Sequence, residues 1–206
     1  MREESIRKVL ERDKEKRQEI AQEQMEEEYI KERERYISEY VNLIDGLLKE
    51  CIVMQSCEGE DKLSGKGRLK YICVSYLRTG VETGTGEYLI RLHDDSYYHD
   101  VHEVEGRYTA EYRSKAWKAD EEYFDKLIMS KFIRAKKYEV KDFLREYLFE
   151  TYVMPMPEVI EDSLDRIKAL DSYRKVKKDK KLALYYRELY GETERKILLY
   201  TEEQKG

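Results

Sequence analysis

Histidine and carboxylate side chains concentrate in one short segment of this sequence. All three histidines of the chain, His93, His99 and His102, lie in residues 92–106 among several acidic residues. Imidazole and carboxylate groups together are usual ligands of zinc, manganese and iron. The segment is therefore a candidate metal centre, which would make the protein a metal-dependent hydrolase. Its spacing matches no known metal motif, so we favour the alternative, a polar loop after a strand, and we expect no cofactor.

A run of basic residues is the second candidate site. Residues 174–181 contain six basic side chains and one acidic side chain, and Tyr173, Tyr185 and Tyr186 flank them. Lysine and arginine neutralise phosphates, and tyrosine rings stack on bases, so the run could bind nucleic acid. The alternative is the solvated face of a helix. The six basic residues are Arg174, Lys175, Lys177, Lys178, Lys180 and Lys181.

The glycine-rich and nucleophile motifs of common enzymes are missing. Five residues separate Gly59 from Gly65, where a P-loop has four, and Gly67 stands where serine or threonine would bind magnesium. The sequence contains no GxSxG motif for a nucleophilic serine. The three cysteines form no CxxC pair, which favours reduced thiols. We therefore lean towards a protein that is not an enzyme.

The composition excludes further classes of protein. The chain has 206 residues, 41% of them charged and 40% hydrophobic, and its net charge is −5. This balance does not indicate nucleic acid or a membrane as the dominant partner. The sequence has no apolar run long enough to span a membrane, and its first residues lack the apolar core of a secretory signal. We expect a cytoplasmic protein.

A long helix over residues 1–50 is the first element predicted. Residues 1–28 are mostly Glu, Lys, Arg and Gln, which favour helix but offer few apolar contacts. Apolar residues recur at spacings of three and four over residues 29–50. We predict that residues 29–50 dock on a domain and that residues 1–28 project as an arm. The apolar residues of the arm that would contact a partner are Ile6, Val9, Leu10 and Ile20.

Residues 51–206 are predicted to form a single α+β domain. Short β-rich runs over residues 51–113, beginning with 51–57, predict a small antiparallel meander of about three or four strands. Helical periodicity returns over residues 117–206 and predicts about four helices, the last over 173–190. Strands and helices that are segregated along the chain favour an α+β fold over a doubly wound one.

These features favour a non-enzymatic protein–protein interaction module, such as a regulator, an inhibitor or an accessory subunit. The helix arm, the 19 tyrosines and the missing catalytic motifs support this hypothesis. The partner would be another protein or a second copy of this chain, bound through the N-terminal helix. Two alternatives stay open: a nucleic-acid-associated protein that uses residues 174–181, and a metal-dependent hydrolase that uses the histidine cluster.

Overall fold

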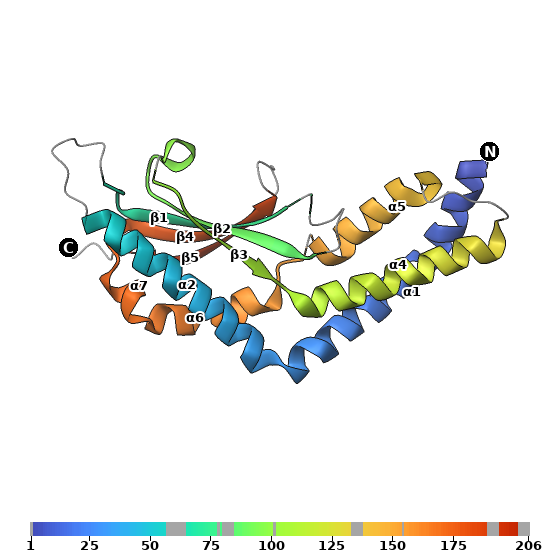
Figure 1. Ribbon diagram of the computed structural model, residues 1–206, viewed down its shortest axis with the longest axis horizontal. Coiled ribbons are helices and arrows are strands. Elements are labelled where there is room, and N and C mark those ends of the chain that lie inside the picture. The colour runs from blue at the N-terminus through green and yellow to red at the C-terminus, as the bar shows by residue number, and fades with distance from the viewer. Residues whose placement is uncertain are drawn as a thin grey trace. The chain divides into compact units, whose positions relative to one another are not determined.

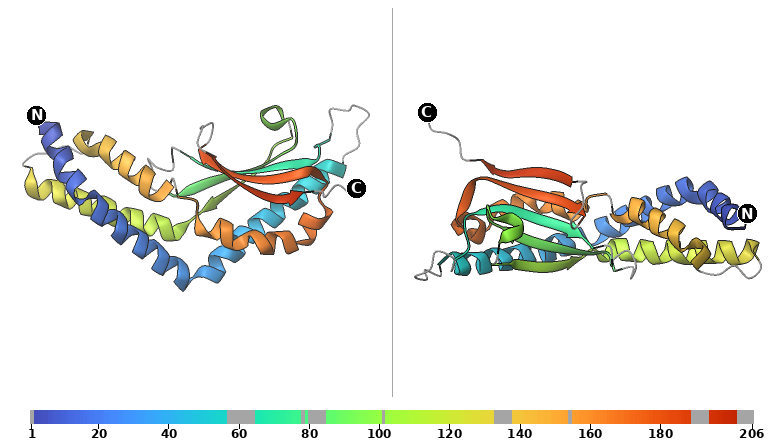
Figure 2. Two further views of the ribbon diagram at one scale, coloured as in Figure 1. Left: turned by 180° about the vertical axis from the view of Figure 1, so that it is seen from behind. Right: turned by 90° about the horizontal axis from the view of Figure 1, so that it is seen from above.

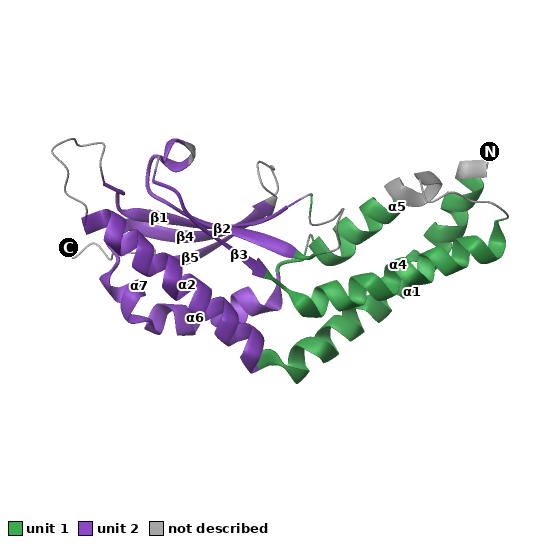
Figure 3. Ribbon diagram, in the orientation of Figure 1, with its two compact units in different colours: residues 1–33, 78–86, 109–156 green, residues 34–77, 87–108, 157–206 purple. Residues whose placement is uncertain are grey.

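The computed structural model describes most of the chain, which divides into two compact units (Figure 3). The predicted α+β fold is confirmed. The units differ from the predicted boundary at residue 50, because each combines segments that are distant in sequence. Unit 1 comprises residues 1–33, 78–86 and 109–156, and unit 2 comprises residues 34–77, 87–108 and 157–206. The described residues are 2–56, 65–77, 79, 85–100, 102–132, 138–153, 155–188 and 194–201, so Gly59 lies outside them.

Unit 1 is built from helices. They are α1 (Arg2–Lys31), α4 (Glu111–Lys131) and α5 (Tyr138–Leu148), and α5 continues into a π-helical turn, η2 (Phe149–Val153). Helix α1 lies alongside α4 and α5 (Figures 1 and 2). The α5–η2 segment ends before Pro155, as the sequence predicts, because proline lacks the N–H that a helix interior requires.

Residues 1–28 do not project as the predicted arm, because α1 buries one side in unit 1. The middle of this buried side is polar: Arg17 contacts Asp120 of α4, and the side chain of Gln18 donates a hydrogen bond to Thr151. Polar residues at these positions interrupt the apolar periodicity. The periodicity therefore did not predict that this side of α1 is buried. The buried apolar residues of α1 are Ile6, Leu10, Ala21, Met25 and Tyr29.

The predicted single N-terminal helix is two helices, and the second is longer than expected. A turn at Glu32 separates α1 from α2 (Arg33–Ser56). The strand predicted over residues 51–57 is wrong, because Cys51 and Gln55 extend the buried stripe of α2 by further turns. The last residue of that run lies outside the described residues. Although α1 and α2 are long, no helix in the described chain is also apolar enough to cross a membrane.

Unit 2 contains a mixed sheet, which has five strands in the described part of the chain. The strand order is β3-β2-β1-β4-β5; β1 runs antiparallel to β2 and parallel to β4, and β4 runs antiparallel to β5. Strands β1 to β3 occupy the region of the predicted meander. Strand β4 was not predicted, and the sequence of residues 196–200, within β5, is ambiguous between strand and helix. The strands are β1 (Leu69–Tyr76), β2 (Glu87–His93), β3 (Val104–Thr109), β4 (Lys178–Glu188) and β5 (Glu194–Thr201).

Strand β4 stands where the sequence predicted a helix over residues 173–190. Only α7 (Asp171–Lys175) is helical there, and the end of the predicted range lies outside the described residues. Leucine, lysine and arginine are good helix formers, which made the helical prediction reasonable. Pairing with the central strand β1 overrides that preference and buries Leu182, Leu184 and Tyr186.

Helices cover one face of the sheet in unit 2. Helix α2, helix α6 (Glu158–Ala169) and α7 lie below the strands in Figure 1. Ile72 and Val74 of β1 are buried, as expected of residues on a covered face. Gly106 of β3 meets α2 closely: a Cβ atom there would lie 2.9 Å from Leu43 Cδ1. The opposite face therefore carries the residues that alternate with Ile72 and Val74.

Candidate nucleic-acid interface

The face of the sheet opposite the helices is rich in tyrosine and basic residues. Strand alternation places Tyr71 on this face, and the register pairs it with His93 of β2. The same register rule brings Tyr185 and Arg187 of β4 onto this face. The residues of β1, β2 and β4 on this face, named here the tyrosine face, are Tyr71, Cys73, Ser75, Leu89, Arg91, His93, Ala183, Tyr185 and Arg187.

Three tyrosine rings meet on the tyrosine face. The ring of Tyr71 packs edge-on against Tyr185, with ring centroids 5.5 Å apart, and against Tyr97, at 5.0 Å. All three side chains are half-buried, so part of each ring is open to solvent. Tyr71 and Tyr185 come from neighbouring central strands, which fixes their separation.

Cationic groups lie beside these rings. The guanidinium of Arg187 lies 5.2 Å from the centroid of the Tyr97 ring, and the ammonium of Lys196 lies 5.2 Å from that of Tyr185. Such contacts are attractive because the ring face is electronegative. Arg187 is 8% exposed, whereas Lys196 is exposed to solvent. The face therefore combines flat apolar rings with positive charge.

A buried ion pair anchors the segment that follows β2. The side chains of Lys66 and Asp100 are 0% and 1% exposed, and they contact each other directly. Lys66 Nζ also donates to the carbonyl oxygen of His102 at 2.7 Å. The carboxylate of Asp100 accepts hydrogen bonds from the backbone N–H groups of Asp94 and His102, at 3.2 and 3.0 Å. Both ends of the segment are thus held by one buried carboxylate.

Asp94 fixes the start of the same segment. Its carboxylate accepts hydrogen bonds from the backbone N–H groups of Gly67 and Ser96, at 2.9 and 2.8 Å. A Cβ atom at Gly67 would lie 2.8 Å from Asp94 Oδ2, so the close approach requires glycine. A short 3-10 turn, η1 (Tyr97–His99), follows and stands over the tyrosine face (Figures 1 and 2).

The predicted metal centre is not assembled in the described part of the chain. His93 is buried on the sheet, His99 is exposed in η1 and His102 is half-buried. No group of three or more His, Cys, Asp or Glu residues among the described residues could hold a metal ion. The nearby carboxylates of Asp94 and Asp100 bind backbone N–H groups and a lysine instead.

The predicted basic run is partly used within the protein. Lys177 donates its backbone N–H to Gln55 Oε1 at 2.9 Å, and Lys178 Nζ donates to backbone carbonyls at the end of α7. Burial lowers the pKa of Lys178. Arg174 lies 3.8 Å from Asp171. The members of the run that are exposed are Arg174, Lys175, Lys177, Lys180 and Lys181, and the last two lie on β4, not on a helix.

The predicted partner-binding residues of the N-terminal helix are largely unavailable. Ile6 and Leu10 are fully buried in unit 1, and Val9 and Ile20 are half-buried. The sequence indicated that these side chains are exposed, because α1 has too few apolar residues for a conventional buried face. In the structure these few residues align into one narrow stripe.

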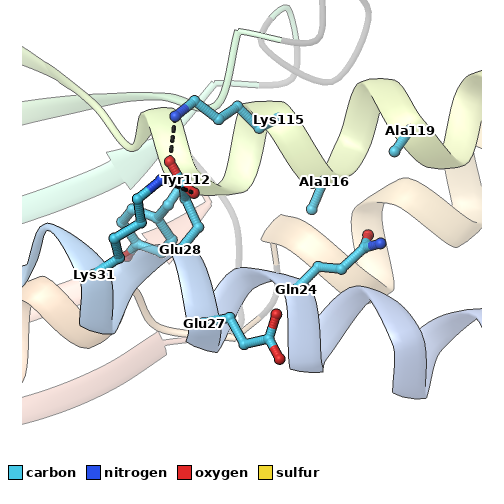
Figure 4. A pocket seen from close by; sticks show the side chains of 8 residues that line it. All are labelled: Gln24, Glu27, Glu28, Lys31, Tyr112, Lys115, Ala116 and Ala119. Atoms are coloured by element: carbon cyan, nitrogen blue, oxygen red, sulfur yellow. Dashed lines mark hydrogen bonds and ion pairs between the residues drawn. The ribbon is translucent and has the colours of Figure 1, made fainter.

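Unit 1 has a shallow groove between α1 and α4, of about 430 Å³ (Figure 4). Helix α1 contributes charged and polar side chains, and helix α4 contributes two alanines, a tyrosine and a lysine. Glu28 forms ion pairs with Lys115 and with Lys31, so opposite charges largely cancel at one end of the groove. The groove is lined by Gln24, Glu27, Glu28, Lys31, Tyr112, Lys115, Ala116 and Ala119.

A closed polar cluster lies inside unit 1 around Asp120. One carboxylate oxygen contacts Arg17, and the other accepts hydrogen bonds from the hydroxyls of Tyr147 and Tyr152, at 2.5 and 2.7 Å. Burial raises the pKa of both tyrosine hydroxyls, and Asp120 raises it further. Asp120 is 0% exposed, so the cluster joins the helices of unit 1 and offers no surface to a ligand.

Comparison with protein-family models, curated proteins and solved structures found no match to this chain.

Proposed function

We propose that unit 2 binds single-stranded nucleic acid on the tyrosine face. The observation that carries the proposal is the pair of half-buried rings, Tyr71 and Tyr185, on neighbouring central strands with Lys196 beside them. Open sheet faces that present aromatic rings stack unpaired bases, and adjacent basic groups contact the phosphates.

The local charge supports single strands better than duplex DNA. The cations that lie beside the rings, Arg187 and Lys196, are few, whereas duplex binding relies on many phosphate contacts. Single-strand binding draws more of its energy from stacking, so a few cations suffice. Lys180 and Lys181 are exposed near the start of β4, on the same strand as Tyr185. Consecutive strand residues point to opposite faces, so one of the two would add a phosphate contact on the tyrosine face.

A protein partner on the same face is the competing hypothesis. Tyrosine is also favoured at protein interfaces, and the first hypothesis from the sequence was an interaction module. The interaction-module hypothesis relied on a projecting N-terminal helix, and it is weakened because Ile6 and Leu10 of that helix are buried. The arrangement of cations over rings favours the nucleic acid.

Fluorescence anisotropy with labelled single strands of about ten nucleotides tests the proposal. We expect the wild-type protein to bind DNA or RNA single strands at low salt and to lose affinity as salt rises. The double variant Tyr71→Ala, Tyr185→Ala should bind about tenfold or more weakly, because each stacked base contributes about 1–3 kcal/mol.

A matched control uses Tyr123, which is also half-buried but lies in unit 1. The Tyr123→Ala variant should bind like the wild type. The proposal fails if the wild type binds no single strand at low salt. It also fails if the Tyr71→Ala, Tyr185→Ala double variant binds as well as the Tyr123→Ala control. In that case a protein that is retained by the tyrosine face, and lost in the double variant, would establish the interaction module instead.

A further inference from the structure

The ring of Tyr97 fills a small cage on the tyrosine face. Three side chains surround it: Tyr71 at 5.0 Å and His93 at 5.2 Å between ring centroids, and the Arg187 guanidinium at 5.2 Å. The cage residues belong to β1, β2 and β4, so the sheet fixes their positions. Tyr97 itself belongs to the η1 turn and not to the sheet.

The backbone of Tyr97 is strained in this position. Its φ angle is 51°, which makes it the one non-glycine residue with a left-handed backbone among the residues described. A tyrosine in this region costs about 1–2 kcal/mol relative to the usual conformations. The anchors at Asp94 and Asp100 hold the two ends of the turn. The ring is therefore held in the cage against a local conformational preference.

His93 has hydrogen-bonding capacity that Tyr97 does not use. Its side chain is 7% exposed, and Nδ1 has no hydrogen-bond partner among the described residues. Burial lowers the pKa of His93, which favours the neutral imidazole with one donor and one acceptor nitrogen. The Tyr97 hydroxyl instead lies 4.0 Å from Cys73 Sγ. A flat ring with polar edge atoms would satisfy His93 better than a phenol does.

We infer that Tyr71, His93 and Arg187 form a nucleobase-binding cage, and that Tyr97 occupies it as an internal plug in the free protein. A base of the single strand displaces Tyr97, packs between Tyr71 and Arg187, and presents its edge to His93. The strain in the η1 turn lowers the free energy needed for displacement. This inference rests on the proposed function, because it assigns one base position within the same face.

Replacement of Tyr97 by glycine tests the plug. Glycine accepts the left-handed backbone, so Tyr97→Gly removes the ring while it keeps the turn. We expect this variant to bind single strands about tenfold more tightly than the wild type, because no plug has to be displaced. The fluorescence of a 2-aminopurine base in the strand should also be quenched more strongly. The Tyr97→Phe variant keeps the ring and should bind like the wild type.

The outcomes separate the inference from the proposed function. If the wild type binds and Tyr97→Gly binds more weakly or equally, Tyr97 is not a plug and the inference fails alone. If neither protein binds, the proposed function fails as well. An independent measurement uses the imidazole ¹⁵N resonances of His93 with adenosine monophosphate as the probe. A shift in Tyr97→Gly that is larger than in the wild type supports the cage, and equal shifts overturn it.

Discussion

Two buried ionisable groups at the residue scale, Asp120 and His93, show how differently a protein can satisfy such groups. Asp120 in unit 1 receives a guanidinium and two hydroxyls. His93 in unit 2 keeps one ring nitrogen without a partner among the described residues. A buried polar atom without a partner requires an explanation, and a bound ligand is one of the possible explanations. Stability measurements test the role of each residue.

The Asp120→Asn variant should lower the free energy of unfolding by about 3–5 kcal/mol. The change leaves Arg17, whose side chain is only 12% exposed, without its counter-charge, and removing one partner is the costly way to break such a pair. Urea unfolding followed by the fluorescence of Trp117, the only tryptophan and a buried residue of unit 1, measures the effect. Glu121→Gln on the same helix is the control, because Glu121 is exposed. Equal stability of the two variants would contradict the structural role of Asp120.

His93 should make stability depend on pH in mildly acidic solution. Burial lowers its pKa below the ordinary histidine value of about 6.5, so the unfolded chain binds the proton more readily than the folded chain. Its contribution is fully present above pH 6.5 and is lost as the pH falls towards the lower folded value. Denaturant unfolding between about pH 5 and pH 8 should show this loss, and His93→Gln should reduce it. A His99→Gln control, at an exposed position, should keep the wild-type pH dependence.

Helix α1 illustrates, at the scale of elements, how a very charged helix can still be part of a core. Its buried residues are few, but they include Ile6 and Leu10, which are fully buried. Ion pairs supplement them: Arg7 contacts Glu146 at 2.8 Å, and Lys14 contacts Glu150 at 2.6 Å. Each exposed pair contributes little on its own, about 0–1 kcal/mol, so the buried stripe decides the stability of the contact.

The Leu10→Asp variant should therefore destabilise unit 1 by about 4 kcal/mol, because it buries an unpaired charge and removes an apolar side chain. Ile30 provides the matched control on the same helix, since its side chain is 63% exposed. Ile30→Asp should leave the unfolding transition of Trp117 fluorescence nearly unchanged. If Leu10→Asp is equally harmless, residues 1–28 behave as the projecting arm that the sequence first indicated.

The elements that depend on local pattern were predictable, and those that depend on distant partners were not. Strands β1 and β2 were expected because they lie in short β-rich runs, and Pro155 correctly marked the end of a helix. The β4 strand was missed because its lysines and leucines also suit a helix, and only pairing with β1 decides between the two. The cage around Tyr97 was likewise hidden, since its members come from three strands and a turn.

Composition was a poor guide to the arrangement of charges over the whole molecule. The chain has 40 basic and 45 acidic residues, and this near balance pointed away from nucleic acid. Many of these charges neutralise one another within a unit, as Lys66 does with Asp100. Arg187 and Lys196 lie beside tyrosine rings. A count of charges along the sequence cannot show which of them the fold brings to these positions.

The parallel pairing of β1 with β4 has a consequence for how the protein forms during synthesis. Strand β1 ends at Tyr76, but its partner begins only at Lys178, so β2, β3 and most of the helices leave the ribosome in between. Until then one edge of the central strand has no native partner, and contacts between residues so distant in sequence form slowly. An unpaired apolar edge is prone to join another chain. Nascent chains that stop before β4 should therefore aggregate or recruit chaperones, whereas chains that include β5 should not.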